Sequence, residues 1–324
     1  MKQTINVGEL AVKCGEKVSK CIVVPGTDYE LPVTIINGCE EGKVFLATAG
    51  VHGCEYPGIE SLVELSQEIE PEDVSGAIIF VLAVNPPALY GRRAYVCPAD
   101  EENKNYNHIS PGNKNGTTAD RVSAFIFDEI VPQCDLHVDM HSGDIVEDLE
   151  EFIAVCNTEN DEMRDFCTKV AQHTCFTHRI NSHGRRELYN SSAIDRNVPG
   201  VLFERGGQGI LNWDEVERDK MDIISICQYL GILEGEAQDN SEGQIYYPRH
   251  YWGEAGHTGL FYKFVETGDE VKKGQKIGEI RDMFGELLEE IHAPFDGRVK
   301  ISNNTLGLSK GDDTFMIGCT REND

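Results

Sequence analysis

The sequence lacks any Cys-x-x-Cys pair although it has eleven cysteines, and none of its apolar runs approaches the ~20 residues needed to cross a bilayer. An odd number of scattered cysteines argues against a disulfide framework or a thiolate metal site, and it favours a reducing, cytoplasmic environment. Residues 1–7 lack the continuous apolar segment of a signal peptide, so we expect a first strand there. No membrane partner is expected.

Positive charge is also scarce. The chain has 29 Lys and Arg residues against 56 Asp and Glu residues, which gives a formal net charge of −27. This balance disfavours nucleic acid and anionic membranes as partners. An anionic substrate would need a local basic pocket. The length of 324 residues is ample for a large core with an additional small domain.

The distribution of apolar residues predicts an α/β domain. Residues 1–42 are expected to form short β segments separated by turn signals. From residue 43 the pattern alternates between strands and helices, which is typical of α/β folds. We expect strands at 44–49, 77–84, 135–140, 152–156 and 200–203, and helices at 56–68, 119–130, 159–174, 187–196 and 214–230.

A polar segment at 234–243 predicts a linker, and helical periodicity is lost beyond it. The region after the linker has short strands with glycine turns, and its segments 266–275 and 293–299 resemble the barrel-sandwich hybrid of lipoyl and biotinyl carrier domains. The turn that would carry the modified lysine, residues 282–286, contains no lysine. We therefore expect a catalytic domain at 1–240 and a carrier-like β domain without carrier function at 241–324.

Two motifs at predicted strand ends indicate a metal site. His52-x-x-Glu55 follows one apolar strand, and Asp139-Met140-His141 ends another. Parallel strands aim their carboxyl ends at one crevice, so His52, Glu55 and His141 can converge. Two imidazoles and one carboxylate are the ligands of a catalytic zinc with an open position for water. The alternative is a loop histidine, a helix-terminal acid favoured by the dipole and a capped histidine.

Two further acids accompany these motifs. Glu204 ends a strand that is otherwise apolar, which suggests a general base beside a zinc-bound water. It could instead pair with Arg205 or be solvated. Asp139 precedes His141 by two residues and therefore faces the same way, so it is either an orienting partner of the metal site or an ordinary strand-end acid.

Substrate contacts are less specific in the sequence. The candidates are Arg92 and Arg93, the pair Asn107-His108, and Arg185 with Arg186. A guanidinium can stabilise the oxyanion of a hydrolytic transition state or hold a carboxylate. Paired arginines in an acidic protein are more often surface ion-pair partners.

Taken together, these motifs resemble the succinylglutamate desuccinylase/aspartoacylase family of the zinc carboxypeptidase clan. The resemblance runs from residue 43 to 207 through Gly50–Glu55, Asn85-Pro86-Pro87, Asp139–His141 and Glu204–Gly206. It implies an α/β/α sandwich with a mixed central sheet and a small all-β C-terminal domain. It also implies one Zn²⁺ per chain on His52, Glu55 and His141, with Glu204 as general base.

The same resemblance implies Arg92 as oxyanion donor, with Arg93 as the alternative register, and an Asn-Arg pair for the substrate carboxylate. Here Asn107 matches, but His108 replaces the arginine. An imidazole cannot make the bidentate contact of a guanidinium. We expect a deacylase acting on a small N-acylated amine or amino acid. Its substrate carboxylate is met by another group such as Arg185 or Arg186, or the preferred substrate lacks a carboxylate. The alternatives are a zinc carboxypeptidase and a metal-retaining binding protein without activity. The β domain could cap the site or mediate homo-oligomerisation.

Overall fold

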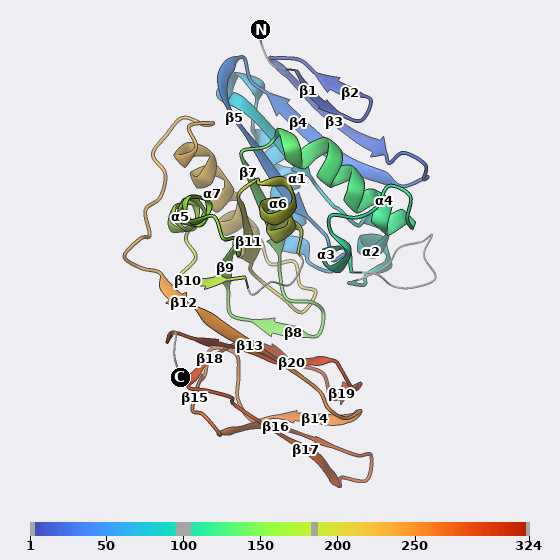
Figure 1. Cartoon of the computed structure of the whole chain (residues 1–324), viewed down its shortest axis with the longest axis vertical. Helices are drawn as coiled ribbons and strands as arrows, with labels where there is room; N and C mark the ends of the chain where they lie inside the picture. Colours follow the sequence, from blue (N-terminus) through green and yellow to red (C-terminus); the bar gives the residue numbers. More distant parts are fainter. Residues whose placement is uncertain (1–3, 95–104, 183–186, 322–324) are drawn as a thin grey trace.

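The computed structural model describes residues 4–94, 105–182 and 187–321. Its centre is a nine-stranded mixed sheet with the order β12-β10-β9-β11-β7-β5-β6-β4-β3 (Figure 1). In chain order these strands are β3 (Glu16–Val23), β4 (Glu30–Asn37), β5 (Glu40–Ala49), β6 (Ser75–Val81), β7 (Leu136–His141), β9 (Phe152–Val155), β10 (His178–Asn181), β11 (Gly200–Glu204) and β12 (Ile245–Tyr247). A small hairpin of β1 (Ile5–Val7) and β2 (Leu10–Val12) precedes them.

The predicted site lies at the ends of the strands in the middle of this sheet. Strands β6, β5, β7 and β11 run parallel, so their carboxyl ends lie at one edge. The register sets Glu204 on β11 directly opposite His141 on β7. β9 and β4 run antiparallel to their neighbours β11 and β6, which makes the sheet mixed as predicted.

Helices cover both faces of the sheet. Side chains alternate along β5, so Phe45 and Ala47 pack in one core cluster and Val44 and Leu46 in another. The first cluster includes apolar residues of α1, α5 and α7, and the second includes those of α4. The predicted α/β/α sandwich is therefore confirmed. The helices are α1 (Tyr56–Glu68), α2 (Pro86–Gly91), α3 (Tyr106–Ile109), α4 (Thr118–Phe125), α5 (Asp161–Gln172), α6 (Leu188–Arg196) and α7 (Trp213–Tyr229).

Local differences from the expected elements have simple causes. The helix expected over 119–130 becomes α4 followed by a π turn, Ile126–Ile130, and a 3₁₀ turn, Val131–Gln133. Pro132 has no N–H to donate to the carbonyl four residues earlier, so regular α-helix cannot continue through it. The expected strand 77–84 ends at Val81, shortly before α2 begins at Pro86.

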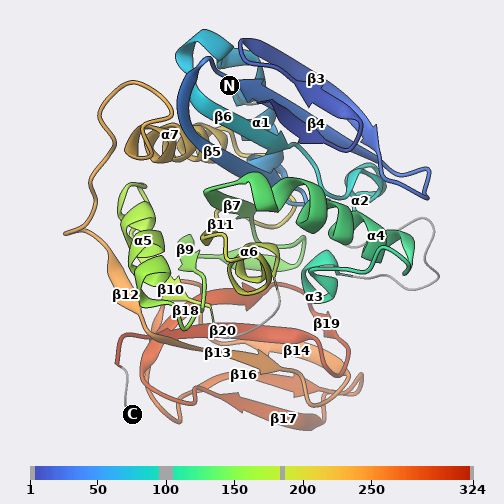
Figure 2. The ribbon, with the colours of Figure 1, turned by 45° about the horizontal axis from the view of Figure 1, so that its top comes forward.

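The C-terminal part consists of two antiparallel sheets (Figures 1 and 2). One has the order β13-β20-β18-β15 and the other β17-β16-β14-β19. Their bounds are β13 (Arg249–Glu254), β14 (Gly259–Lys263), β15 (Glu270–Val271), β16 (Lys276–Arg281), β17 (Leu287–His292), β18 (Gly297–Asn303), β19 (Gly307–Leu308) and β20 (Asp313–Cys319). Between residues 4 and 321, outside the two undescribed gaps, no helix is both long and apolar enough to span a bilayer.

The two parts of the chain exchange strands. β8 (Glu147–Leu149), which follows His141 closely, pairs with β18 of the C-terminal part. Conversely β12, which lies after the predicted boundary at residue 240, pairs with β10 in the main sheet. The C-terminal part is therefore hydrogen-bonded to the segment that leaves the candidate site, and the sequence-based division at 240 does not coincide with this exchange.

Candidate metal centre and active site

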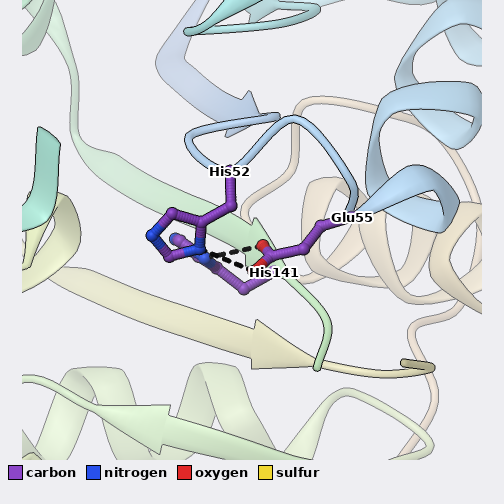
Figure 3. Close-up of side chains that lie close together, drawn as sticks. All are labelled: His52, Glu55 and His141. Carbon is purple, nitrogen blue, oxygen red and sulfur yellow. Dashed lines mark hydrogen bonds and ion pairs between the residues drawn. The ribbon is translucent and has the colours of Figure 1, made fainter. Parts of the chain in front are cut away.

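The structure brings His52, Glu55 and His141 together at the carboxyl edge of the sheet (Figure 3). Glu55 lies between the two rings, with its Oε1 2.6 Å from His52 Nδ1 and its Oε2 2.9 Å from His141 Nδ1. The three potential ligand atoms lie within 4.8 Å of one another. All three side chains are largely buried, His52 being the most exposed at 13%.

The local sequence explains how His52 and Glu55 reach one point. The turn between β5 and α1 packs against α2 so closely that a Cβ on Gly53 would lie 2.1 Å from the carbonyl carbon of Ala88. Only glycine fits there. Glu55 occupies the N-cap position of α1, but its carboxylate makes no capping hydrogen bond. The alternative interpretation of Glu55 as a simple helix-terminal acid therefore does not account for where its side chain points.

Both imidazoles are oriented by acceptors on their far nitrogens. His52 Nε2 lies 3.1 Å from Asn105 Oδ1, and His141 Nε2 lies 3.2 Å from Asp139 Oδ2. An oxygen acceptor at Nε2 favours a hydrogen there, so that in the neutral form of each ring the Nδ1 lone pair would be available to a metal ion at the centre; in the protonated form Nδ1 donates to Glu55. A carboxylate and two such nitrogens fit zinc or a similar divalent cation.

A buried chain of hydrogen bonds continues behind Asp139. Thr48 Oγ1 lies 2.6 Å from Asp139 Oδ1 and 2.8 Å from His137 Nε2, and His137 Nδ1 lies 2.8 Å from Ser192 Oγ on α6. Burial lowers the pKa of His137 to about 4, so its ring is neutral at pH 7. Because a carboxylate only accepts, Thr48 must donate to Asp139 and accept from His137 Nε2–H. The single hydroxyl hydrogen of Ser192 is shared between His137 Nδ1, at 2.8 Å, and the carbonyl of Leu188, at 3.1 Å.

The charges within the triad support one another. Burial alone would raise the pKa of Glu55, but the two imidazoles more than offset it and hold that pKa well below its usual range. Burial opposes a charge on His141, yet Asp139 and Glu55 raise the pKa of His141 above its ordinary value. A site with this much negative charge around two imidazoles attracts a cation.

Glu204 sits next to the triad with a free oxygen. It is opposite His141 in the parallel pair β7–β11, and its Oε2 is buried without a hydrogen bond among the described residues. Burial, followed by the charges of Glu55, Glu147 and Glu187, raises the pKa of Glu204 well above its usual value, against the lowering effect of His141. An unsatisfied buried carboxylate oxygen needs a hydrogen-bond partner such as a bound water molecule.

Arg205 is not the partner of Glu204. Its guanidinium is 1% exposed and binds Glu151 at 3.1 Å, Asp219 at 2.6 Å and Asp222 at 2.7 Å. The alternative in which Glu204 pairs with Arg205 is therefore wrong. Instead, the backbone N–H of Arg205 donates to the carbonyl of His141, which fixes the two strand ends beside each other.

The predicted substrate contacts lie in different places. Arg92 and Arg93 are exposed just after α2, where the carbonyl of Ala94 accepts a hydrogen bond from Gly53 N–H. Asn107 is buried, and its Oδ1 accepts from the backbone N–H of Leu188 at 3.4 Å. His108 is exposed on α3. Arg185 and Arg186 lie outside the described residues, so their predicted role, like that of Arg92 and Arg93, stays a prediction.

A cavity of about 200 Å³ opens beside Glu204. Its lining residues come from the neighbouring strands β9, β10 and β11, from the segment that begins α6, and from β13 and β20 of the C-terminal part. The lining residues are Phe152, Ala154, Ile180, Ser182, Glu187, Tyr189, Leu202, Glu204, His250, Trp252 and Met316. This volume is below the ~300–1,000 Å³ typical of larger ligand pockets, so it admits a small metabolite.

Several residues of the site were missed by the sequence analysis. Asn105 orients His52, Thr48 links Asp139 to His137, and Glu187 lines the cavity. Asn105 has a weak signal, since it is a polar N-cap residue two positions before the noted Asn107. Thr48 has none, because a threonine inside an apolar strand is ordinary.

This geometry agrees with the similarity of the chain to known proteins. A model of the succinylglutamate desuccinylase/aspartoacylase catalytic domain matches residues 41–230. The N-alpha-acetyl-L-2,4-diaminobutyric acid deacetylase of Halomonas elongata is 29% identical over 295 residues, which is 89% of this chain and 85% of that protein.

Solved structures show the same fold. A succinylglutamate desuccinylase/aspartoacylase from Rhodobacter sphaeroides aligns with a TM-score of 0.80 at 24% identity, covering 93% of this chain and 95% of that one. The product-bound ectoine utilization protein EutE (DoeB) of Ruegeria pomeroyi also aligns with a TM-score of 0.80 at 24% identity, covering 93% and 94%.

Proposed function

The chain belongs to the succinylglutamate desuccinylase/aspartoacylase family and is a hydrolase of N-acyl amide bonds, and we propose that it is a zinc-dependent deacylase of a small N-acylated amine or amino acid. The observation that carries the proposal is the position of Glu204. Its buried Oε2 lacks a hydrogen bond, it lies opposite His141, and it opens on a small cavity. His52, Glu55 and His141 would hold the metal ion.

The residues of the site have separable roles in this reaction. When bound, zinc polarises the scissile carbonyl and lowers the pKa of the attacking water. Glu204 Oε2 accepts a proton from that water and returns it to the departing nitrogen. Its raised pKa suits this exchange, because a carboxyl group with an ordinary pKa would be a poor acid at pH 7. Arg92 is the proposed donor to the oxyanion, with Arg93 as the alternative.

Three observations favour a deacylase over the alternatives. His250, Trp252 and Met316 of the C-terminal part line the cavity, whose volume of about 200 Å³ leaves little room for a peptide. A binding protein without activity would not need a buried carboxylate beside the metal ligands, since an unsatisfied polar group is costly. The relative from Halomonas elongata is named for removal of an acetyl group from a small diamino acid.

The test is release of primary amine from a panel of N-acyl amino acids, monoacylated diamines and blocked dipeptides, with zinc and with a chelator. We expect chelator-sensitive release from one acylated class and none from blocked dipeptides. Glu204→Gln should abolish turnover and still hold one zinc ion per chain. Near-normal activity of that variant would remove Glu204 from the role of general base, and activity confined to C-terminal residues of peptides would establish the carboxypeptidase alternative.

The cytoplasmic location and an assembly of several copies are also part of the proposal. The described cysteines are all free thiols, in keeping with a reducing compartment.

A further inference from the structure

Lys300 on β18 is a lysine whose side chain is completely buried, and a β-bulge places it there. Val299 and Ile301 pair with two adjacent residues of β20, which leaves Lys300 as the extra residue of β18. Val299 and Ile301 are buried too, and three consecutive buried residues break the alternation of a regular strand. A bulge redirects a side chain in this way. The burial of this ammonium group is therefore a built feature of the C-terminal part.

The ammonium group of Lys300 reaches from the C-terminal part to the main domain (Figure 2). Its Nζ donates to Glu150 Oε2 at 2.8 Å and to Nδ1 of His178 on β10. Burial, followed by the charge of Lys300, lowers the pKa of His178, so its ring is neutral at pH 7 and accepts this hydrogen bond. Arg298 of β18 binds the same Glu150 carboxylate, with its Nε 2.9 and 2.8 Å from the two oxygens. Two cations of one strand thus hold two segments of the main domain.

Both partners of Lys300 lie next to residues that line the cavity beside Glu204. His178 and Ile180 are two residues apart on β10 and therefore face the same way, and Ile180 lines the cavity. Glu150 precedes Phe152, a second lining residue, by two positions, and Lys300 Nζ lies 5.9 Å from the centre of the Phe152 ring. Lys300 therefore contacts the main domain directly beside its share of the cavity lining.

The C-terminal part supplies further lining residues from the strands that carry Lys300. Trp252 on β13 and Met316 on β20 both line the cavity and lie opposite each other in register. β20 in turn pairs with β18, where Met316 lies opposite Ile301, the residue after Lys300. The spacing between the two sets of lining residues is therefore set by how β18 docks on the main domain.

We propose that Lys300 is a positioning residue for the substrate, because it fixes the C-terminal part on the main domain at the spacing that the cavity needs to bind its substrate. The kinetic consequence rests on the proposed deacylase function, in which the substrate binds beside Glu204. A buried ammonium group is screened by little water, so its contacts hold this spacing more firmly than a surface ion pair would.

The first experiment removes the ammonium group and measures KM and kcat separately. Lys300→Met keeps a similar side-chain length and leaves Glu150 paired with Arg298. In the zinc-loaded full chain we expect KM for the substrate identified by the panel to rise by about tenfold, because a small misfit in a pocket costs this much, while kcat stays within about threefold. A merely structural role would reduce the folded fraction, which lowers kcat and leaves KM unchanged. Lys276→Met is the matched control, since Lys276 binds two glutamates inside the C-terminal part and should leave KM unchanged.

A fluorescence measurement separates this inference from the proposed function. The sequence has two tryptophans, and Trp213 is exposed on α7, so Trp213→Phe leaves Trp252 as the only indole. In that background, Lys300→Met should increase acrylamide quenching of Trp252 by about twofold, because looser docking opens the junction to solvent. Lys276→Met should leave the quenching unchanged. If no substrate of the panel is hydrolysed, the proposed function fails, and the quenching alone decides the inference.

Glu150→Gln tests the same junction if Lys300→Met does not fold. It neutralises the carboxylate and keeps its shape, and it should raise both KM and the quenching of Trp252. An unchanged KM or unchanged quenching in either folded variant overturns the role of Lys300. An equal effect of Lys276→Met also overturns it, because the change would then come from any lost ion pair of the C-terminal part.

Discussion

Replacing Thr48 with valine should lower the affinity of the candidate site for zinc, although Thr48 is not one of the three predicted ligands. The hydroxyl of Thr48 is buried and donates to Asp139 Oδ1 at 2.6 Å while it accepts from His137 Nε2 at 2.8 Å. Valine has nearly the same shape but neither function. It leaves a carboxylate oxygen and an imidazole N–H buried without partners.

The expected cost follows from these two lost partners. A buried polar group that loses its hydrogen bond costs about 1–3 kcal/mol, and a charged group lies at the upper end of this range. The free energy of unfolding should therefore fall by about 2–5 kcal/mol. Asp139 would also orient His141 less firmly, and loss of such support typically weakens metal binding by about 10- to 100-fold. Zinc affinity from competition with a chromophoric chelator, and urea unfolding of the metal-free protein, measure the two effects separately.

A matched control lies on strand β4, which is separated from β5 by β6 in the same sheet. Thr34 is equally buried, but its hydroxyl contacts only Ser19 Oγ, at 2.8 Å, among the side chains described. Thr34→Val should cost about 1 kcal/mol and leave zinc affinity unchanged. Thr48→Ser, which keeps the hydroxyl, should restore most of the affinity. If Thr48→Val binds zinc within about twofold of the wild type, the hydrogen-bond chain does not support the metal site and this reasoning is refuted.

Three further predictions concern other parts of the molecule. The folded-state pKa of His137 is about 4, below its unfolded value of ~6.5, so the unfolded state binds more protons between these pH values. The free energy of unfolding should therefore fall by about 2 kcal/mol between pH 7 and pH 5. Urea unfolding of the metal-free protein measures this loss, and a His137→Gln variant should not show it. His108→Arg should raise kcat/KM for simple N-acyl amino acids, by about tenfold if the guanidinium reaches the carboxylate, and no gain in a normally folded variant would contradict this. Arg205→Ala should destabilise the fold by about 3–5 kcal/mol in thermal or urea unfolding, because Asp219 and Asp222 would remain buried without their cation, and a change below 1 kcal/mol would contradict that account.

Much of the candidate site could be predicted from short patterns. His52 and Glu55 are three residues apart in one turn, so local geometry alone brings them together. His141 and Glu204 each end an apolar strand, and the shared carboxyl edge of parallel strands follows from the α/β pattern. Asp139 was left undecided between two roles, and its contact with His141 Nε2 favours orientation of the ligand.

The support of the site could not be predicted in the same way. Asn105 meets His52 across 53 residues, and Thr48 meets His137 across 89. Side chains so distant in sequence are brought together only by strand register and loop packing. A threonine or an asparagine gives no signal in the sequence for such a contact. The pairing of Arg205 with α7 rather than with Glu204 likewise depends on how that helix docks on the sheet.

The sequence by itself determined the strand and helix pattern, the two motifs of the candidate metal site and the candidate base, because spacing of apolar residues and chemistry of neighbouring side chains are local properties. Tertiary structure alone decided which acceptors fix the imidazole tautomers, where Glu187 faces, and that β8 pairs with β18 of the C-terminal part. These depend on how segments that are separated in the chain pack and pair, where the free energy lies in hydrogen-bond register and packing and leaves no periodic trace in the sequence.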